Sequence, residues 1–377
     1  MAVVYENPSP LNEIAGILQK EKPHSILLLN GENSYYASGA EKLISPQLKG
    51  YRVTYASTRN QIPSIEDVRK TITLIRENNI DFIIAVGGGK VMDIAKAAAL
   101  LYKETMPIKE YITAKIKANG SNLPRILIPT TSGSGAEITP FAVVYIDKTK
   151  YSLAHPSMVP EHILLDPSLT YSLPPKITAQ TGVDALAQAI EGLWSVKSTE
   201  ESRQYSREAI PIILSNIVQA VNAPTPENRA AMMYAAHLAG KSIAIAKTTA
   251  AHAISYPLTA YHNIPHGHAV MLTLPYFFPI NENVTPENIQ NGLAIDTVKT
   301  RISELLSLLS AKDGEEARDK LISLMEQIGL ETRLSRLGIH GGDLGNIIDH
   351  GFNPQRVINN PVMVTETIER GILTRIL

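Results

Sequence analysis

Residues 82–101 are Phe82-Ile-Ile-Ala-Val-Gly-Gly-Gly-Lys-Val-Met-Asp-Ile-Ala-Lys-Ala-Ala-Ala-Leu-Leu101. The apolar run before the three glycines predicts a buried strand, and the segment after them predicts a helix. Glycine lets the backbone turn tightly and approach a ligand, and the free amides at the start of a helix favour an anion. We therefore expect a pyrophosphate to bind here, with a plain tight turn as the alternative. A nucleoside-triphosphate loop is excluded, because Val91 follows Lys90 where that loop requires Ser or Thr.

A second ligand-binding turn is expected at Pro129-Thr-Thr-Ser-Gly-Ser-Gly-Ala-Glu137, which follows the apolar run 126–128. The four hydroxyls and two glycines of these nine residues can bind phosphate or ribose oxygens. Parallel strands end at a common edge of their sheet, and an open α/β sheet binds its ligand at that edge. Together the two turns predict one dinucleotide site.

The pattern of apolar residues divides the chain into two parts. From Ser25 to Asp166, short apolar runs alternate with helical periodicity, which is typical of βαβ units and a parallel sheet. We expect strands at 26–29, 82–86, 126–128, 141–147 and 162–166, a crossover helix that begins at Ser64 between the first two strands, and a polar connection at 148–160. A proline-rich connector then leads into long helical patterns. The prediction is an α/β domain over 1–170 and an all-α domain over 171–377, with a ligand cleft between them.

Composition excludes several classes of function. The 377 residues contain 35 Lys and Arg against 36 Asp and Glu, a formal charge of −1, which argues against nucleic-acid binding. Cysteine is absent, which removes disulfides and thiolate metal sites. No apolar run reaches the ~18 residues that a membrane-spanning helix needs, and the first residues lack the pattern of a signal peptide. We therefore expect a cytoplasmic protein without a membrane or nucleic-acid partner.

Asp and His residues in the second half predict a metal or proton-transfer site. Asp184 and Gln188 are four residues apart, so both face one side of a helix. Four of the 10 histidines fall within 17 residues, at His252, His262, His266 and His268. A single histidine is usually structural, but four so close in an apolar setting favour a metal or a proton relay. Asp and His without Cys suit Fe(II) or Zn(II) with an open coordination position.

These motifs resemble those of the iron-containing alcohol dehydrogenase family, over nearly the whole chain. The family's G-G-G-S-x-x-D-x-A-K is similar to residues 87–96, its P-T-T-x-G-T-G-S-E to residues 129–137, and its D-P-x-L-T…L-P to residues 166–174. The resemblance implies the dehydroquinate synthase-like fold of that family, in which a Rossmann-like dinucleotide-binding domain precedes a helical metal-binding domain. It also allows a homodimer, because relatives commonly form dimers or larger assemblies.

The resemblance implies a ligand set for the metal. The family holds its ion with one Asp and three His, and the matching positions here are Asp184, Gln188, His252 and His266. Gln188 stands where the family has a His, and an amide oxygen is a weaker donor than imidazole toward Fe(II) or Zn(II). Tyr256 stands where many relatives place a further active-site His. A metal-independent enzyme similar to the maleylacetate reductases is therefore an alternative.

The departures from the family pattern resemble the branch that includes phosphonoacetaldehyde reductases. The segment 194–202 and the triplet Lys247, Thr248 and Thr249 carry this resemblance. Those enzymes reduce phosphonoacetaldehyde to 2-hydroxyethylphosphonate with NAD(P)H, and a dianionic substrate needs cationic and hydroxyl donors near its carbonyl. We expect the triplet to bind the substrate, with a solvated helix-end lysine as the alternative for Lys247. The sequence is also compatible with an alcohol dehydrogenase of broader specificity and with a non-catalytic dinucleotide-binding protein.

One position bears on the choice of cofactor. NAD-preferring relatives have an Asp after the first strand, which binds the ribose 2′-hydroxyl and repels a 2′-phosphate. Here the residue is Asn30, so NADPH is favoured and NADH is the alternative. Lys150 matches a family lysine near the nicotinamide ribose. The expected cofactor-binding residues are Asn30, Gly87, Gly88, Gly89, Lys90, Asp93, Thr130, Thr131, Ser134 and Lys150.

The expected reaction is the reduction of a small aldehyde to an alcohol. A metal held by the predicted ligands would supply Lewis-acid polarisation of the aldehyde carbonyl, and the cofactor would supply the hydride. Tyr256, His262 or His268 relays a proton through water, and the sequence does not choose among them.

Overall fold

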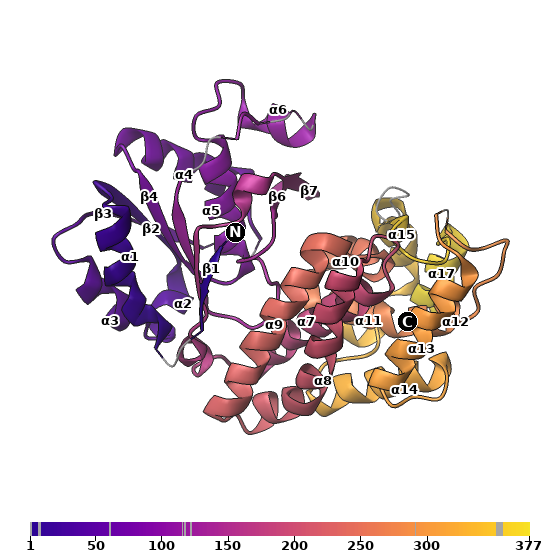
Figure 1. Cartoon of the computed structure of the whole chain (residues 1–377). Coiled ribbons are helices and arrows are strands. Elements are labelled where there is room, and N and C mark those ends of the chain that lie inside the picture. Colours follow the sequence, from indigo (N-terminus) through magenta and orange to yellow (C-terminus); the bar gives the residue numbers. More distant parts are fainter. Residues whose placement is uncertain are drawn as a thin grey trace. The chain divides into compact units, whose positions relative to one another are not determined.

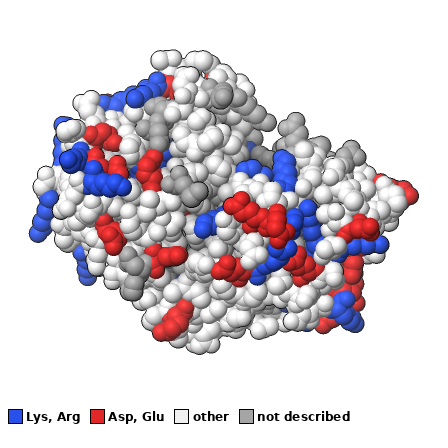
Figure 2. Space-filling view, viewed as in Figure 1, with Lys and Arg blue, Asp and Glu red and all other residues white. Residues whose placement is uncertain are grey.

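The computed structural model describes residues 2–6, 9–59, 62–114, 116, 118–120, 123–290, 292–351 and 357–377. The chain divides into two compact units, residues 1–173 and 174–377 (Figure 1). The first unit is built around a parallel sheet and the second is helical, which confirms the predicted fold class. On the face shown in Figure 2, acidic and basic side chains lie interspersed, in keeping with the balanced charge.

A six-stranded sheet forms the centre of the N-terminal unit. Its strands are β1 (Val3–Tyr5), β2 (Ser25–Gly31), β3 (Arg52–Thr58), β4 (Phe82–Gly87), β5 (Arg125–Pro129) and β8 (His162–Leu164), in the order β1-β8-β5-β4-β2-β3. The described pairs in this sheet are parallel, so the strands end at a common edge. The central strands β2, β4 and β5 are buried along their whole length, which explains their continuous apolar sequence.

Helices cover both faces of this sheet. The helices of this unit are α1 (Glu13–Glu21), α2 (Glu32–Ala37), α3 (Ala40–Ile44), α4 (Ile65–Glu77), α5 (Gly89–Leu101) and α6 (Ile108–Thr113). The face that carries Leu27 and Ile83 packs with apolar residues of α4 and α5. The face that carries Ile26 and Ile84 packs with apolar residues of α1 and α3. As predicted, Ser64 caps α4, because its Oγ accepts a hydrogen bond from the amide of Asp67 at 3.1 Å.

Three strands are absent from the prediction, namely β1, β3 and β7 (Thr149–Ala154). β3 is an edge strand, and much of β7 is exposed, so neither needs a continuous apolar run. The prediction of a polar connection over 148–160 is wrong for β7, which pairs antiparallel with β6 (Phe141–Ile146) outside the main sheet. Since β3 precedes α4, the helix that follows Ser64 connects β3 with β4 rather than the first two predicted strands.

The C-terminal unit is helical around one apolar core. Its helices are α7 (Pro175–Trp194), α8 (Glu200–Asn222), α9 (Pro226–Ala246), α10 (Ala250–His262), α11 (His266–Thr273), α12 (Phe277–Glu282), α13 (Ile295–Leu308), α14 (Gly314–Gln327), α15 (Leu344–Gly351) and α17 (Glu366–Arg375). α7 is buried on all sides from Gly182 to Trp194, so any polar side chain in that stretch must find a partner inside the unit. Within the described residues, no helix combines the length and apolar character that crossing a bilayer requires.

Candidate metal centre and dinucleotide site

The glycine turn lies at the carboxyl edge of the sheet. β4 ends at Gly87, and Gly88 is the extended N-cap of α5. The amide of Thr130, just after β5, donates to the carbonyl of Gly87 at 3.0 Å, so the two predicted turns lie side by side. A Cβ on Gly89 would lie 2.5 Å from the Oγ of Ser134, closer than real contacts allow. Glycine at this position therefore permits the close approach of the two turns.

Hydroxyls at this edge have the chemistry that a dinucleotide requires. Thr58 at the end of β3, Thr130 after β5 and the neighbouring Ser132 are buried. Within the described part of the chain, their hydroxyl oxygens have no hydrogen-bond partner. Buried hydroxyls are normally paired, so these three are suited to the phosphate or ribose oxygens of a bound dinucleotide. Thr58 and Ser132 were outside the predicted set, Thr58 because its strand was not predicted.

Other predicted cofactor residues lie close to the same edge. Asn30 is buried near the end of β2, and its side-chain oxygen accepts a hydrogen bond from the Oγ of Ser57 at 2.8 Å. Thr131 lies beside Gly88, where an added Cβ would lie 3.5 Å from its hydroxyl. Lys90 stands half-buried in the first turn of α5, and this burial lowers its pKa.

Asp93 has a different place from the one expected. One of its oxygens lies 3.1 Å from the ammonium of Lys96, and the other accepts a hydrogen bond from the amide of Val143 at 3.1 Å. Burial raises the pKa of Asp93, although the charge of Lys96 opposes this. Both oxygens are thus engaged by protein groups, one within α5 and the other across to β6, and the expectation that Asp93 binds the cofactor does not fit this geometry. Lys150 lies on β7, close enough for its charge to lower the pKa of Asp93.

The Lys96 side chain holds the second ligand-binding turn, residues 129–137, in place. Its side chain is fully buried, and its ammonium donates to the carbonyl of Ala136 at 2.7 Å and to the Oγ1 of Thr139 at 3.1 Å. Burial lowers the pKa of Lys96, whereas the charge of Asp93 raises it. The Lys96 ammonium thus holds the hydroxyl-rich turn against α5. Asp93 and Lys96 are three residues apart on a predicted helix, and this spacing is the signal in the sequence that indicates an ion pair between them.

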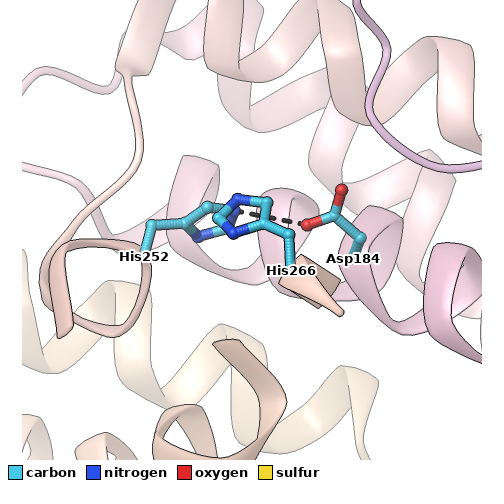
Figure 3. A group of neighbouring side chains, drawn as sticks. All are labelled: Asp184, His252 and His266. Carbon is cyan, nitrogen blue, oxygen red and sulfur yellow. Dashed lines mark ion pairs between the residues drawn. The ribbon is translucent and has the colours of Figure 1, made fainter. Parts of the chain in front are cut away.

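Three potential metal ligands converge in the C-terminal unit. Asp184 on α7, His252 on α10 and His266 at the start of α11 offer ligand atoms that all lie within 4.8 Å of one another. Figure 3 shows the two imidazoles beside each other and the Asp184 carboxylate directed at them. Nε2 of His252 lies 3.5 Å from Oδ1 of Asp184, and the two imidazole centroids are 5.4 Å apart. Helices distant in the sequence therefore bring together three of the four predicted ligands.

Gln188, the fourth predicted ligand, lies one turn after Asp184 on α7. Its Nε2 donates to Oδ2 of Asp184 at 3.3 Å. Its Oε1 is buried, and within the described residues neither this oxygen nor Nε2 of His252 has a hydrogen-bond partner. Two buried donor atoms of this kind, beside a carboxylate and a second imidazole, fit a divalent cation that takes nitrogen and oxygen ligands.

The electrostatics at His252 depend on two carboxylates. Burial by itself lowers the pKa of the imidazole, but the neighbouring carboxylates of Glu191 and Asp184 outweigh it and raise the pKa to about 9. Glu191 is fully buried, and its Oε2 accepts a hydrogen bond from Nδ1 of His252. Glu191 was not among the predicted residues, although its place seven residues after Asp184 puts both on one face of α7.

Gly267 allows α11 to carry His266 into this site. A Cβ at position 267 would lie 2.1 Å from the carbonyl oxygen of Gln180 and 2.6 Å from the Cβ of Asp184. Both of these atoms belong to α7, so α11 packs directly on the backbone of that helix. The Pro-His-Gly sequence therefore places an imidazole where the two helices meet.

The three predicted proton-relay residues separate in the structure. Tyr256 on α10 is half-buried, and its ring lies parallel to that of His266 at a centroid distance of 6.1 Å. His268 is buried, and its Nε2 donates to the carbonyl of Glu331 at 2.6 Å, so it attaches α11 to the loop after α14. Burial also lowers the pKa of His268. His262 is partly exposed at the last residue of α10. Tyr256 is thus the one of the three that this geometry places against a predicted metal ligand.

The predicted substrate triplet lies between α9 and α10. Lys247 is half-buried and ends α9 with φ 61° and ψ 164°, and its ammonium donates to the carbonyl of Ala244 at 3.0 Å. Thr248 is half-buried, and its carbonyl accepts a hydrogen bond from Asn359. Thr249 is buried, and its hydroxyl donates to Oε1 of Glu191 at 2.7 Å. The expectation that Thr249 contacts substrate does not fit, because its hydroxyl is committed to Glu191.

Comparisons with known proteins agree with this architecture. Residues 2–167 match the iron-containing alcohol dehydrogenase family, and residues 178–375 match the C-terminal domain of the Fe-containing alcohol dehydrogenase family. Sulfoacetaldehyde reductase of Bilophila wadsworthia is 32% identical over 79% of this chain and 77% of its own length. Phosphonoacetaldehyde reductase of Streptomyces viridochromogenes is 37% identical over 56% of this chain and 55% of its own length.

A solved structure gives the same result for the fold. The sulfoacetaldehyde reductase of Bifidobacterium kashiwanohense, in complex with NAD+, is 29% identical, with a TM-score of 0.88 over 100% of this chain and 96% of that one. The family matches cover both units, and the similar proteins are alcohol dehydrogenases and aldehyde reductases. The chain therefore belongs to the iron-containing alcohol dehydrogenase family and is an NAD(P)-dependent oxidoreductase of alcohols and aldehydes.

Proposed function

We propose that this enzyme reduces a short aldehyde that carries a phosphonate, phosphonoacetaldehyde, to 2-hydroxyethylphosphonate. NADPH is the proposed hydride donor, since the neutral Asn30 tolerates a 2′-phosphate that an Asp would repel. The observation that carries the substrate proposal is the half-buried Lys247, which ends α9 immediately before the helix that presents His252.

The backbone at Lys247 supports a functional role for its side chain. A φ of 61° with a ψ of 164° is a conformation that residues other than glycine rarely adopt. Holding a side chain there costs about 1–3 kcal/mol, and such strain concentrates at functional sites. Burial lowers the pKa of Lys247, and the charge of Lys197 lowers it further, so two ammonium groups influence this region. A half-buried ammonium with a second positive charge in its surroundings suits an anionic group on the substrate.

The metal centre supports the reaction type. Asp184, Gln188, His252 and His266 would hold Fe(II) or Zn(II), in agreement with the buried atoms of Gln188 and His252 that have no hydrogen-bond partner among the described residues. When bound, such an ion supplies Lewis-acid polarisation of an aldehyde carbonyl. Tyr256, stacked on His266, is the residue that we propose for proton delivery to the product alkoxide.

Sulfoacetaldehyde is a second candidate substrate. Two of the similar proteins are sulfoacetaldehyde reductases, and one of them aligns with this chain over its full length. A sulfonate and a phosphonate are both tetrahedral groups with negatively charged oxygens. Lys247 would bind either group by the same charge-assisted hydrogen bonds. The phosphonate carries the larger charge and is therefore preferred by a site that two lysines influence.

A comparison of two substrates and one substitution test the proposal. We expect wild-type enzyme to oxidise NADPH with phosphonoacetaldehyde at a higher kcat/KM than with acetaldehyde. Lys247→Ala should lower kcat/KM for the phosphonate about 10- to 100-fold, the value of a charge-assisted hydrogen bond, and leave acetaldehyde turnover nearly unchanged. Lys241→Ala is the matched control, because Lys241 is on the same helix and lies over the ring of Tyr205, with its Nζ 5.3 Å from the ring centroid.

Three outcomes would contradict the proposal. Equal turnover of acetaldehyde and phosphonoacetaldehyde, with no effect of Lys247→Ala, indicates an alcohol dehydrogenase of broader specificity. A higher kcat/KM for sulfoacetaldehyde than for the phosphonate indicates the second candidate. Full activity of enzyme that has been freed of metal by a chelator indicates a metal-independent reductase.

A further inference from the structure

We propose that Glu191 is a positioning residue for the metal centre. In this role Glu191 fixes the start of α10 and the orientation of the His252 imidazole, so that Nε2 of His252 faces Asp184. The inference rests on the proposed metal-dependent function. It adds a residue that lies behind the predicted ligands rather than among them.

The placement of Glu191 follows from the geometry of α7. Asp184, Gln188 and Glu191 are separated by four and then three residues, so they form one stripe along this buried helix. The first two side chains reach the candidate metal centre, where Gln188 bonds to Asp184. The third reaches the first turn of α10. A single helix therefore presents two predicted ligands and also holds a third ligand that comes from another helix.

The Glu191 carboxylate accepts hydrogen bonds from four groups. Oε1 accepts from the hydroxyl of Thr249 at 2.7 Å, from the amide of Ala251 at 3.1 Å and from the amide of His252 at 3.4 Å. Oε2 accepts from Nδ1 of His252. Burying a carboxylate is costly unless donors compensate it, and Glu191 has an exposed fraction of 0%. Since both oxygens are engaged, Glu191 is not itself placed to act as a metal ligand.

The same contacts cap helix α10 across the unit. The N-cap residue Thr249 makes no capping hydrogen bond within its own helix, because its hydroxyl is turned to Glu191. The amides of Ala251 and His252 would otherwise remain unsatisfied at the helix start, and Glu191 accepts from both. Negative charge at a helix N-terminus is also favourable. The position of α10, and with it the Cα of His252, therefore depends on Glu191.

The contact with Nδ1 sets which nitrogen of His252 is available. A carboxylate at Nδ1 keeps a proton on that nitrogen, so Nε2 is the nitrogen whose proton a metal would displace. Nε2 is the atom that lies 3.5 Å from Asp184. The indole of Trp194 donates to the Thr249 hydroxyl at 3.0 Å, so the network is anchored in the apolar core. Glu191 therefore holds the imidazole in the orientation that coordination through Nε2 requires.

Metal binding without substrate tests this role. Full-length protein is freed of metal by a chelator and titrated with Co(II) against a competing chelator, and the visible absorption of bound Co(II) is recorded. Glu191→Gln should weaken Co(II) binding about 10- to 100-fold and alter the absorption spectrum. Thr249→Val, which removes one donor, should cause a smaller loss of about 3- to 10-fold, and Thr249→Ser should retain wild-type affinity.

A matched control separates positioning from general stability. Glu282 accepts a hydrogen bond from the amide of Gly314, the first residue of α14, so it also caps a helix from another part of the same unit. Glu282→Gln should leave Co(II) affinity and spectrum unchanged. If Glu191→Gln does not fold, the comparison of Thr249→Val with Thr249→Ser still tests the proposal.

Several results of the Co(II) titrations would overturn the proposed role of Glu191. Wild-type affinity and spectrum in Glu191→Gln and Thr249→Val would overturn the role of Glu191, as would an equal loss in Glu282→Gln. Wild-type protein that binds no Co(II) would overturn this role together with the proposed metal centre. Neither readout uses aldehyde or NADPH, so a wrong substrate assignment would show in the kinetics and not in these titrations.

Discussion

Single side chains at the metal centre differ in how well the sequence could predict them. Asp184, His252 and His266 were predictable, because histidine clustering and motif resemblance both point to them. Glu191 was not, because its role arises from contacts with residues about 60 positions away, at a sequence separation of 58 for Thr249 and 61 for His252. Local patterns carry no record of such pairings. Side-chain chemistry therefore identifies ligands more readily than the residues that orient them.

Gln188 offers a direct test at the scale of one residue. We expect Gln188→His to raise the affinity for Zn(II) at least about 10-fold, because imidazole is a stronger donor than an amide oxygen toward this ion. Competition with a chelator of known affinity measures the change. Gln188→Leu, which offers no donor, should bind Zn(II) more weakly than wild type. Equal affinities in all three proteins would show that position 188 does not coordinate the metal.

At the scale of helices and strands, the degree of burial determined which elements the sequence pattern could predict. The strands β2, β4 and β5 are buried on both faces, and their apolar runs predicted them. The edge strand β3 and the hairpin strand β7 carry mixed side chains, so their pattern resembled that of a loop. Of the four clustered histidines, two meet at the metal centre and His268 attaches α11 to the loop after α14. Spacing along the chain could not separate these roles.

The contact between α11 and α7 gives a prediction for these elements. Gly267→Ala would force its Cβ against the α7 backbone, so we expect a loss of about 2–4 kcal/mol in the free energy of unfolding. We also expect a marked loss of Co(II) affinity, because His266 moves with α11. Chemical denaturation and metal titration measure the two effects.

Gly371→Ala is the control for this substitution. Gly371 also lies in a helix, α17, but a Cβ there meets nothing within 4 Å. Alanine should stabilise the protein by about 0.5–1 kcal/mol, because it suits a helix better than glycine. Wild-type stability and Co(II) affinity in Gly267→Ala would contradict the proposed close packing of α11 on α7.

At the scale of the whole molecule, one buried carboxyl should influence how stability depends on pH. Glu369 on α17 is fully buried, and within the described residues neither of its oxygens has a hydrogen-bond partner. Burial and the charge of Glu366 raise the pKa of Glu369 to about 8, from an ordinary value of 4.5. A raised pKa in the folded state means that protonation favours folding. This contribution is fully present below pH 4.5 and is lost as the pH rises through about 8.

Glu369→Gln removes this dependence, because glutamine is neutral throughout. We expect the variant to gain stability over wild type by roughly 2 kcal/mol more at pH 9 than at pH 6. Urea denaturation at the two pH values measures the difference. Glu326→Gln, at an exposed position on α14, should show no such trend. A constant difference between Glu369→Gln and wild type at both pH values would contradict the assignment.

Because the backbone at Lys247 is strained, variants at this position would rank differently by stability and by activity. Glycine would relieve the strain of φ 61° and ψ 164°, so a screen that scores only resistance to unfolding would favour glycine over lysine. A screen that scores turnover of an anionic aldehyde would favour lysine. The two rankings diverge at residue 247, so thermal selection alone would steer this enzyme away from its proposed substrate.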